Sequence, residues 1–302
     1  MRILKTESEP DYVRDYYEFV CEKLSSIPSE ISYSVIGLDQ FDVDPSHALF
    51  ESTKSKKKVF INYEHNLVHP AVPYYPLFGS IPIKGEEPSK YLVRIEQPNR
   101  LMESDFYIEY GRPNIENIKS CPPLSSILEK VIYVPPILCE YSPGNKEERT
   151  ENLLTSFYIL NQEGRPRRKM LHDRMKQEII GYTNIPMCFG QELYDKYYKS
   201  AKVMVNVHQT DHHHTFEELR VLPALLNGLV VVAEDSPLKE KVPYHEYIIW
   251  AKYEDIADAA KDAIERHEYH YDRIHGPNSG LREIIGQMRR QLEIDLAEAF
   301  KK

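Results

Sequence analysis

Residues Lys202 to Trp250 read KVMVNVHQTDHHHTFEELRVLPALLNGLVVVAEDSPLKEKVPYHEYIIW, and this stretch decides the fold. An apolar run, Val203 to Val207, leads into a His-rich loop. An amphipathic helix then ends at Gly228, before a second apolar run, Leu229 to Ala233. Short buried strands that alternate with helices are typical of a parallel sheet covered on both faces. Ligands bind such sheets in the loops that follow the strand ends. We therefore expect a binding site in the loops of this stretch.

The composition predicts a globular protein of about two domains. The chain has 302 residues, of which 41% are hydrophobic and 28% are charged. A formal net charge of -9 argues against a general nucleic-acid binder but allows a local basic pocket. We expect no membrane span, because no run approaches the ~20 apolar residues it needs, and no signal peptide. The cysteines lie far apart without a CxxC pair, which favours free thiols in a reducing compartment and a cytoplasmic location.

The chain divides at a polar, turn-rich segment, Tyr141 to Asn152. We expect a first domain over residues 1–142 and a second over 143–280. The second domain alternates strands and helices in the manner of a doubly wound sheet. Its predicted strands are 153–160, 178–185, 203–207, 229–233 and 247–250, and its predicted helices include 169–177, 191–200 and 253–265. The first domain is less regular, with a helix at 12–24, strands at 31–38, 58–63, 91–95, 106–110 and 131–134, and a Pro-rich loop at 71–88.

The start of the central helix combines a capping pattern with charged side chains. Thr215 to Glu218 reads TFEE, which predicts Thr215 as the N-cap and Glu218 as the third helical residue. Glu217 lies in the first turn, where it either accepts hydrogen bonds from ribose hydroxyls or only complements the helix dipole. Arg220 either points back at an anionic group or pairs with Glu217. Pro223 inside the helix removes a backbone hydrogen bond and predicts a kink.

A second cluster of charge, Gly164 to Arg168, follows the first strand of the second domain and reads GRPRR. Arginines at a helix start oppose the helix dipole, which favours anions there. A diphosphate is the natural counterpart, and the alternative is a solvated basic helix start. Arg165 is the favoured phosphate contact, with Arg168 beside it.

Histidines follow the strand at Val203 to Val207. A metal site at His212 to His214 is disfavoured, because adjacent residues seldom converge on one ion. Contacts to a phosphate or sugar, or a plain exposed loop, remain open for them. His208, at the end of a buried strand, is the better site residue.

The first domain offers candidate bases after its strand at 58–63. Glu64, His65 and His69 could each deprotonate a hydroxyl group, and histidine suits this role because its pKa lies near neutral pH. The alternative for each is an ordinary polar loop residue. Asp105, Glu109 and Arg112 are weaker candidates.

Several motifs are absent from the sequence. It contains no GxxxxGK[ST], GxGxxG or GxSxG pattern and no kinase HRD/DFG pair. These absences disfavour phosphate-loop NTPases, Rossmann dehydrogenases, α/β-hydrolases and kinases.

The second half of the chain resembles the C-terminal domain of GT-B glycosyltransferases, in particular exostosin-like and related short bacterial and viral transferases. The residues that carry the resemblance are Asn206, His208, Phe216-Glu217, Arg220, Ala224, Gly228, Val230 to Glu234, Ser236-Pro237, Pro243-Tyr244 and Ile249-Trp250. It covers roughly residues 153–265. The first half carries no motif that we assign.

The resemblance implies an α/β enzyme with two Rossmann-like domains facing a cleft. The second domain would hold a nucleotide-sugar donor, the first would shape the acceptor site, and the last helix, 281–302, would cross back to the first domain. Retaining members commonly carry two glutamates separated by seven residues. Here the partner of Glu217 would be Leu225, which favours inversion.

We therefore predict a hexosyl- or pentosyltransferase that moves a sugar from a nucleotide-diphosphate donor, with UDP-sugars favoured, to a glycan or glycoprotein hydroxyl. We expect it to be inverting and metal-independent, with no cofactor besides the donor. The expected catalytic residues are His65, Glu64 and Arg220. The expected donor contacts are Arg165, Arg168, His208, His214, Thr215, Phe216, Glu217 and Arg220. A sugar-nucleotide epimerase of GT-B shape and a non-catalytic nucleotide- or glycan-binding protein remain alternatives.

Overall fold

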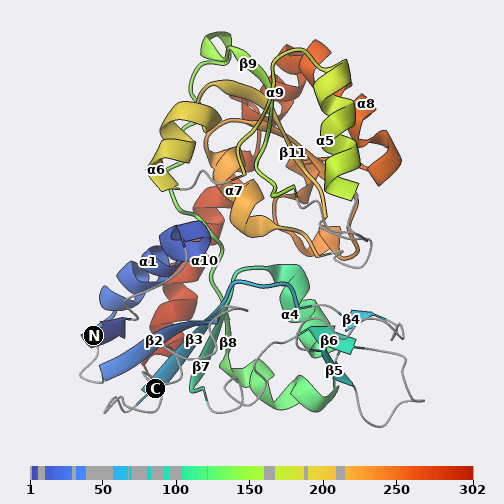
Figure 1. Cartoon of the computed structure of the whole chain (residues 1–302). Coiled ribbons are helices and arrows are strands. Elements are labelled where there is room, and N and C mark those ends of the chain that lie inside the picture. The colour runs from blue at the N-terminus through green and yellow to red at the C-terminus, as the bar shows by residue number, and fades with distance from the viewer. Residues whose placement is uncertain are drawn as a thin grey trace. The chain divides into compact units, whose positions relative to one another are not determined.

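The computed structural model describes residues 2–5, 11–28, 32–38, 57–66, 68–69, 80–82, 92–94, 104–120, 122–159, 167–186, 190–208 and 215–301 (Figure 1). Contacts divide the chain into two compact units: unit 1 is Met1–Pro136 with Arg290–Lys302, and unit 2 is Ile137–Arg289. The sequence placed the first boundary at residue 142, six residues later. The chain leaves unit 1 at Pro136, just beyond the last strand of that unit, since proline cannot donate to a strand ladder.

Unit 1 is built on a parallel sheet with the strand order β1-β2-β3-β7-β8. The strands are β1 (Arg2–Lys5), β2 (Ser32–Leu38), β3 (Lys57–Asn62), β7 (Phe106–Glu109) and β8 (Val131–Tyr133). The predicted strands at 31–38, 58–63, 106–110 and 131–134 lie within one residue of β2, β3, β7 and β8, whereas the sequence did not predict β1.

Helix α1 (Asp11–Ser25) packs on this sheet with buried tyrosines. The Tyr16 hydroxyl donates to the Val134 carbonyl at 2.6 Å, and the Tyr17 hydroxyl donates to the Val35 carbonyl at 2.8 Å. These two bonds tie the helix to β2 and to the residue that follows β8. A buried hydroxyl needs such a partner, so the tyrosines fix the helix as well as filling the core.

The rest of unit 1 follows β3 and β7 along the chain. It contains helix α4 (Arg112–Lys119), a 3-10 helix η1 (Pro122–Lys130), and an antiparallel sheet of β4 (Val68–His69), β6 (Leu92–Arg94) and β5 (Ser80–Pro82). The expected loop at 71–88 is wrong at β5. The sequence also missed α4, because half of its buried positions, Pro113 and Asn114, are not apolar residues of a helical stripe.

Unit 2 is built on a parallel sheet with the order β10-β9-β11-β12-β13. The strands are β9 (Glu151–Thr155), β10 (Tyr182–Asn184), β11 (Ala201–Asn206), β12 (Val230–Glu234) and β13 (Ile249–Ala251). The chain leaves β9 in one direction along the sheet and β11 in the other, so the strand order reverses between these two neighbours. The predicted strand at 153–160 is wrong beyond Thr155, where its pairing ends, and Glu178 belongs to a helix rather than to the next strand.

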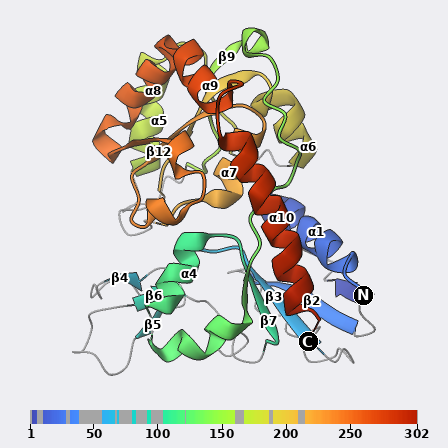
Figure 2. The ribbon, with the colours of Figure 1, turned by 180° about the vertical axis from the view of Figure 1, so that it is seen from behind.

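Helices cover the unit 2 sheet on both faces (Figures 1 and 2). They are α5 (Arg167–Glu178), α6 (Gly190–Glu192) with a π-helical continuation (Leu193–Tyr198), α7 (Glu218–Leu226), α8 (Ile256–Glu265) and α9 (His267–His275). Helix α10 (Leu281–Ala299) begins in unit 2, and its residues from Arg290 onward belong to unit 1. Short 3-10 turns lie at Lys146–Glu148, Lys239–Lys241, His245–Tyr247 and Tyr253–Asp255. Because β9-α5-β10 and β11-α7-β12 run in opposite directions, right-handed crossovers put α5 and α7 on opposite faces.

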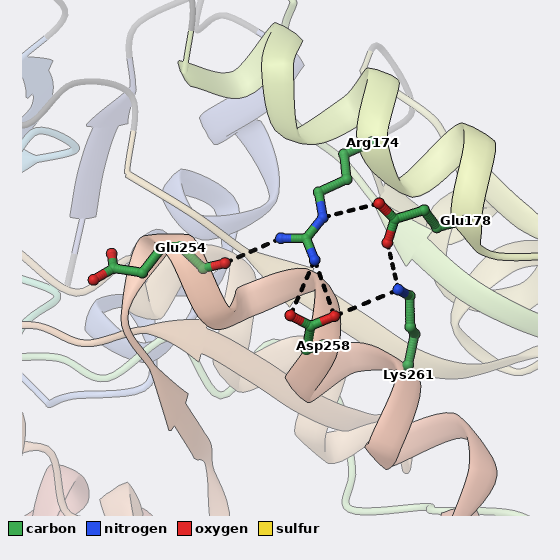
Figure 3. Close-up of polar contacts among 5 residues, drawn as sticks. All are labelled: Arg174, Glu178, Glu254, Asp258 and Lys261. Carbon is green, nitrogen blue, oxygen red and sulfur yellow. Dashed lines mark hydrogen bonds and ion pairs between the residues drawn. The ribbon is translucent and has the colours of Figure 1, made fainter.

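Helices α5 and α8 are joined by an exposed network of ion pairs (Figure 3). Arg174 donates to both oxygens of Asp258 at 2.9 Å and 3.0 Å, to Glu178 at 3.1 Å and to the Glu254 carbonyl at 3.0 Å. Lys261 pairs with Glu178 and, at 3.4 Å, with Asp258. Exposed pairs contribute only about 0–1 kcal/mol each, so this network supports the packing of the two helices without deciding it.

The turn between α7 and β12 requires glycine. Gly228 has φ +83°, and a Cβ atom there would lie 2.2 Å from the Pro143 carbonyl oxygen. Buried Arg149 holds the same turn, because its guanidinium donates to the carbonyl oxygens of Pro143 at 2.7 Å and Asn227 at 2.5 Å. The predicted helix stop at Gly228 is therefore confirmed, with a close backbone approach as its cause.

Candidate functional site

The strand order of unit 2 reverses between β9 and β11, whose carboxyl ends are neighbours in the sheet. Ligands of doubly wound sheets bind in the crevice outside such a point. β9 ends at Thr155 and β11 at Asn206, and the helices that follow them begin at Arg167 and Glu218. These strand ends and helix starts, which we call the switch-point edge, carry most of the predicted donor contacts.

Arg167, the first residue of α5, is held by a buried carboxylate. Its guanidinium donates to the two oxygens of Glu234 at 3.0 Å and 2.6 Å, and the side-chain exposures of this pair are 11% and 10%. Glu234 Oε2 also accepts from the His208 backbone N–H at 2.9 Å. The Tyr253 ring lies 4.0 Å from the guanidinium. Arg167 thus serves to fix the start of α5 to the end of β12 through a two-pronged ion pair.

Arg168, the next residue, lacks such a partner. Its guanidinium donates to the Val207 carbonyl at 3.2 Å and lies 5.6 Å from the Phe157 ring centre. Among the described residues it pairs with no carboxylate, and its buried Nε finds no acceptor. Burial, followed by the positive charge of Arg220, lowers the pKa of Arg168 to about 9. This side chain is therefore a half-buried cation without a paired carboxylate among the described residues.

Arg220, one turn into α7, belongs to the same cluster. Its Nη1 donates to the Asn206 side-chain oxygen at 3.1 Å, which anchors it to the end of β11. An ion pair with Glu217 was the alternative from sequence, yet Arg220 forms no ion pair within the described part of the chain. Its effect on the pKa of Arg168 shows that the two guanidinium groups are near each other.

The predicted capping box is wrong. Helix α7 begins at Glu218, and its N-cap is Glu217, with φ -85° and ψ 74° and no side-chain capping bond. Phe216 is fully buried, 4.9 Å from the Trp250 ring centre, and this packing keeps the chain before Glu218 out of the helix. The Glu218 carboxylate is buried and accepts from the Tyr244 hydroxyl at 3.1 Å instead of closing the box.

Thr215 and Glu217 therefore take different places from those expected. The Thr215 hydroxyl is buried and has no hydrogen-bond partner among the described residues. The half-buried Glu217 raises the pKa of Arg168, so its carboxylate lies near the cationic cluster. Because Phe216 is packed in the core, only its backbone is left to contact a ligand. The donor contacts predicted for these residues stay predictions.

The histidine and arginine candidates are only partly described. His208 is 7% exposed, and its Nε2 lies 3.4 Å from the Asp235 carbonyl oxygen, so it lines the end of β11 with most of its surface covered. Arg165 and His214 lie outside the described residues. The structure therefore brings together Arg168, His208, Glu217 and Arg220 from the predicted donor set.

The candidate bases follow β3 in unit 1. Glu64 and His65 are both half-buried, and the His65 Nδ1 lies 3.3 Å from the Tyr110 hydroxyl. The Glu64 backbone is fixed by Asn62, whose side chain accepts from its N–H at 3.1 Å and donates to its carbonyl at 2.6 Å. The structure gives His69 a place in β4 but does not describe its side chain.

Glu109, a weaker candidate base, is fully buried at the end of β7. Burial is the largest influence on it and raises its pKa from 4.5 to about 8, against the opposing effect of hydrogen bonds from neighbouring amides. A carboxyl group with no exposed surface cannot touch an acceptor, so Glu109 is not the base. The amide shell around it could not be predicted, because its members, from Asn62 to Asn114, are far apart in the sequence.

Two further findings concern metal sites and membrane spans among the described residues. Within them, no group of three or more His, Cys, Asp or Glu side chains could hold a metal ion. No helix in the described part of the chain is long and apolar enough to cross a membrane.

Comparisons with known proteins show which proteins the chain is similar to. No family model matches it. It is 25% identical over 80 residues to the uncharacterized protein R358 of Acanthamoeba polyphaga mimivirus, a match that covers 25% of this chain and 29% of R358.

Among solved structures, TarM superposes with a TM-score of 0.50 and 11% identity over 93% of this chain and 58% of TarM. A sucrose-phosphate synthase from Thermosynechococcus elongatus superposes with a TM-score of 0.46 and 10% identity over 96% of this chain and 77% of that protein. The chain thus spans less than two thirds of TarM and less than a third of R358. The likeness to TarM shows the fold. It confirms the expected GT-B architecture of two α/β units, each built on a parallel sheet.

Proposed function

We propose that the chain is a glycosyltransferase that moves a sugar from a nucleotide-diphosphate donor, with UDP-sugars favoured, to a hydroxyl group of a glycan or glycoconjugate. The reaction proceeds with inversion at the anomeric carbon, and protein cations rather than a metal ion stabilise the leaving group. The GT-B fold supports the reaction class. The switch-point edge of unit 2 supports the identity of the donor.

One observation carries the proposal: Arg168 and Arg220 lie near each other at the switch-point edge, and neither pairs with a carboxylate among the described residues. A partly buried cation without a counter-ion costs free energy, and two neighbouring cations cost more. A diphosphate supplies the missing negative charge and the missing acceptors. The backbone N–H groups at the start of α7 add donors of the kind that bind phosphates.

The same groups suit the chemical step. When the bond between the sugar and the diphosphate breaks, negative charge builds on the leaving phosphate. Arg168 and Arg220 are already in position to receive that charge. Removing one such donor typically costs about 3 kcal/mol of barrier, or roughly a hundredfold in rate.

Other residues take the remaining roles in the proposal. Glu217 accepts hydrogen bonds from the ribose hydroxyls, and the unpartnered Thr215 hydroxyl is available to the donor. His65 or Glu64 removes the proton of the acceptor hydroxyl. Inversion is favoured because Leu225 occupies the position of the second carboxylate that retaining relatives of this type carry.

The metal-independent part of the proposal needs its own test. The expectation of a metal-independent reaction rested on the absence of an Asp-x-Asp triplet, and this is wrong, because Asp42-Val43-Asp44 is such a triplet. It lies outside the described residues. Such triplets supply carboxylate ligands for divalent cations. Transfer that continues unchanged in EDTA supports the proposal, and transfer that requires added Mg²⁺ or Mn²⁺ overturns this part of it.

A nucleotide screen tests the donor site. Thermal unfolding is followed with UDP, GDP and ADP in turn, since a ligand at 100 times its Kd stabilises the folded state by about 2.7 kcal/mol. One nucleotide should raise the Tm of the wild type, and Arg220→Ala should remove most of that rise. Arg174→Ala is the control, because Arg174 pairs with Asp258 at 2.9 Å on the exposed side of α5 and α8. No response to any of the three nucleotides contradicts the proposal.

A transfer assay separates the proposal from its alternatives. The nucleotide sugars that match the responding nucleotide are incubated with glycan acceptors, and the products are identified by mass spectrometry. A new glycosidic product supports the transferase. An isomerised donor in the absence of acceptor indicates an epimerase, and binding without any product indicates a non-catalytic binding protein.

A further inference from the structure

Glu109, at the end of β7, is a fully buried carboxyl group in a shell of neutral donors. Its Oε2 accepts from Asn62 Nδ2 at 2.8 Å and from Asn66 Nδ2 at 2.7 Å. Its Oε1 accepts from Asn114 Nδ2 at 2.8 Å and from the Gly111 backbone N–H at 3.3 Å. No Lys, Arg or His pairs with it in the described part of the chain. Both oxygens are therefore satisfied by amides alone.

The orientation of two of these amides is fixed by the backbone. The Asn62 side-chain oxygen accepts from the Glu64 N–H at 3.1 Å, and the Asn114 side-chain oxygen accepts from the Asn66 N–H at 3.1 Å. An amide whose oxygen is used in this way must turn its NH₂ group to the other side, which here is the side of Glu109. The shell is thus built to donate to a carboxyl group at this position.

The bonds converge on one short segment, Asn62–Asn66, which follows β3. Asn114, from helix α4, donates to the Glu64 carbonyl at 3.1 Å as well as to Glu109, and Asn117 donates to the Asn66 carbonyl at 2.7 Å. Asn62 and Asn66 hold the two ends of the segment to the same carboxyl group. Glu109 is therefore the point at which the segment, β7 and α4 are joined.

We propose that Glu109 is a positioning residue, whose carboxyl group fixes the segment Asn62–Asn66 and thereby the place of Glu64 and His65. The proposal rests on the proposed function, which assigns the deprotonation of the acceptor to one of these two side chains. Glu109 itself has no exposed surface and does not touch the acceptor.

The reason for a carboxyl group lies in the two equivalent acceptors of its ionised form, which is the form present above the pKa of about 8. Glutamine has nearly the same shape but only one accepting end, so its NH₂ group must face two of the four donors. Those donors lose their acceptor inside the protein, where an unsatisfied polar group is costly. The segment should then loosen although the fold is kept.

Hydrogen exchange of backbone amides tests the inference without any activity. Above pH 8, where Glu109 is ionised, the Glu64 and Asn66 amides of Glu109→Gln should exchange about tenfold faster or more than those of the wild type, because their acceptors belong to the disturbed shell. The amides of Val59–Ile61 in β3 should keep their protection. The matched control is Glu116→Gln, since Glu116 lies on α4 and pairs with Lys119 at 2.7 Å.

Two results of this experiment would overturn the inference. One is unchanged exchange of the Glu64 and Asn66 amides, and the other is equal acceleration throughout β3, which would mark Glu109 as a general stability residue. If Glu109→Gln does not fold, Asn66→Ala removes a single donor to Glu109 and leaves the Asn66 N–H bonded to Asn114. It should speed exchange of the same two amides by a smaller factor, and unchanged exchange there is again contradictory.

Kinetics supply the second readout. With the donor and acceptor identified, Glu109→Gln should lower kcat about 10- to 100-fold and leave KM for the donor unchanged, because a base displaced by a fraction of an ångström slows the chemical step. An increase in the donor KM alone contradicts a role in placing the base. A protein that transfers no sugar refutes the proposed function only, since the exchange result decides the role of Glu109 independently.

Discussion

The carboxyl edges of the two parallel sheets treat charge in opposite ways. In unit 2, Arg168 and Arg220 lie near each other, and neither is paired with a carboxylate among the described residues. In unit 1, Glu109 has no cationic partner within the described ranges either, but four amide donors satisfy its two oxygens. At the edge in unit 2, positive charge is left for a ligand to neutralise. At the edge in unit 1, the amide donors bond to a carboxyl group of the protein itself.

This difference separates binding from positioning. A site for a charged ligand has to keep hydrogen-bonding capacity unspent until the ligand arrives, at a cost in stability. A site that fixes a loop does the reverse, because a fully satisfied buried network is rigid. The same contrast occurs within unit 2 between adjacent residues, since Arg167 is paired with Glu234 while Arg168 is not.

The largest effect is expected when the ion pair between Arg167 and Glu234 is broken. Arg167→Met removes the cation and leaves the buried Glu234 carboxylate with the His208 N–H as its hydrogen-bond donor in the described part of the chain. Breaking a buried pair in this way costs about 3–5 kcal/mol of unfolding free energy. Urea unfolding of the purified variant measures it. A loss below about 1 kcal/mol would mean that the pair behaves like an exposed one.

The pH dependence of stability tests the state of Glu109 in unit 1. Because burial raises the pKa of Glu109 from 4.5 to about 8, the folded protein holds a proton that the unfolded chain releases. The resulting stabilisation is complete below pH 4.5 and is lost as the pH rises towards 8, with a slope of at most about 1.4 kcal/mol per pH unit.

Urea unfolding between pH 6 and pH 8 checks this expectation by comparing the wild type with Glu109→Gln. Other groups titrate in both proteins, so only the difference between the two slopes reports on Glu109. The wild type should lose stability faster with rising pH than the variant. Parallel slopes would show that Glu109 keeps an ordinary pKa.

A third prediction concerns Arg168, the neighbour of Arg167 in the sequence. Arg168→Met should leave the ligand-free protein as stable as the wild type or more stable by about 1 kcal/mol, since it removes a half-buried charge that has no counter-ion among the described residues and keeps the apolar stem. The same variant should weaken nucleotide binding. Urea unfolding and a nucleotide titration measure the two effects, and a destabilisation as large as that of Arg167→Met would erase the contrast between the two arginines.

The smallest effect is expected at the ion pairs between α5 and α8 (Figure 3). The side chains of Arg174 and Asp258 are 35% and 62% exposed, so their pair should contribute about 0–1 kcal/mol. A double-mutant cycle of Arg174→Ala and Asp258→Ala by urea unfolding gives the coupling. A coupling above about 2 kcal/mol would mean that this exposed ion pair stabilises the protein more than exposed pairs usually do.

The sequence predicted those parts of the fold in which apolar patterning and glycine act together. The runs around β11 and β12 are almost wholly buried, and Gly228 ends the intervening helix for a steric reason. Helix α9 was missed because its buried residues include His267, His270 and His275, which a hydrophobic pattern counts as surface. The start of α7 was misplaced because the burial of Phe216 outweighs the local capping preference.

The candidate site was predictable only where its residues are close in sequence. Glu217 and Arg220 share one helix start, and Arg168 lies at another, so charge patterning pointed to each of them. The pairing of Arg167 with Glu234 joins residues 67 positions apart, and nothing local distinguishes Arg167 from Arg168. The amide shell of Glu109 depends equally on contacts between distant strands and helices.

Isothermal titration calorimetry of UDP and uridine, with the GDP/guanosine and ADP/adenosine pairs alongside, tests the central claim most directly. The claim is that the unpaired arginines at the switch-point edge receive a diphosphate. For one pair, the diphosphate should bind at least about tenfold more tightly than its nucleoside, a difference of about 1.4 kcal/mol, and Arg168→Met or Arg220→Ala should remove that advantage. If every diphosphate binds no better than its nucleoside, or the advantage survives in both variants, the claim is contradicted.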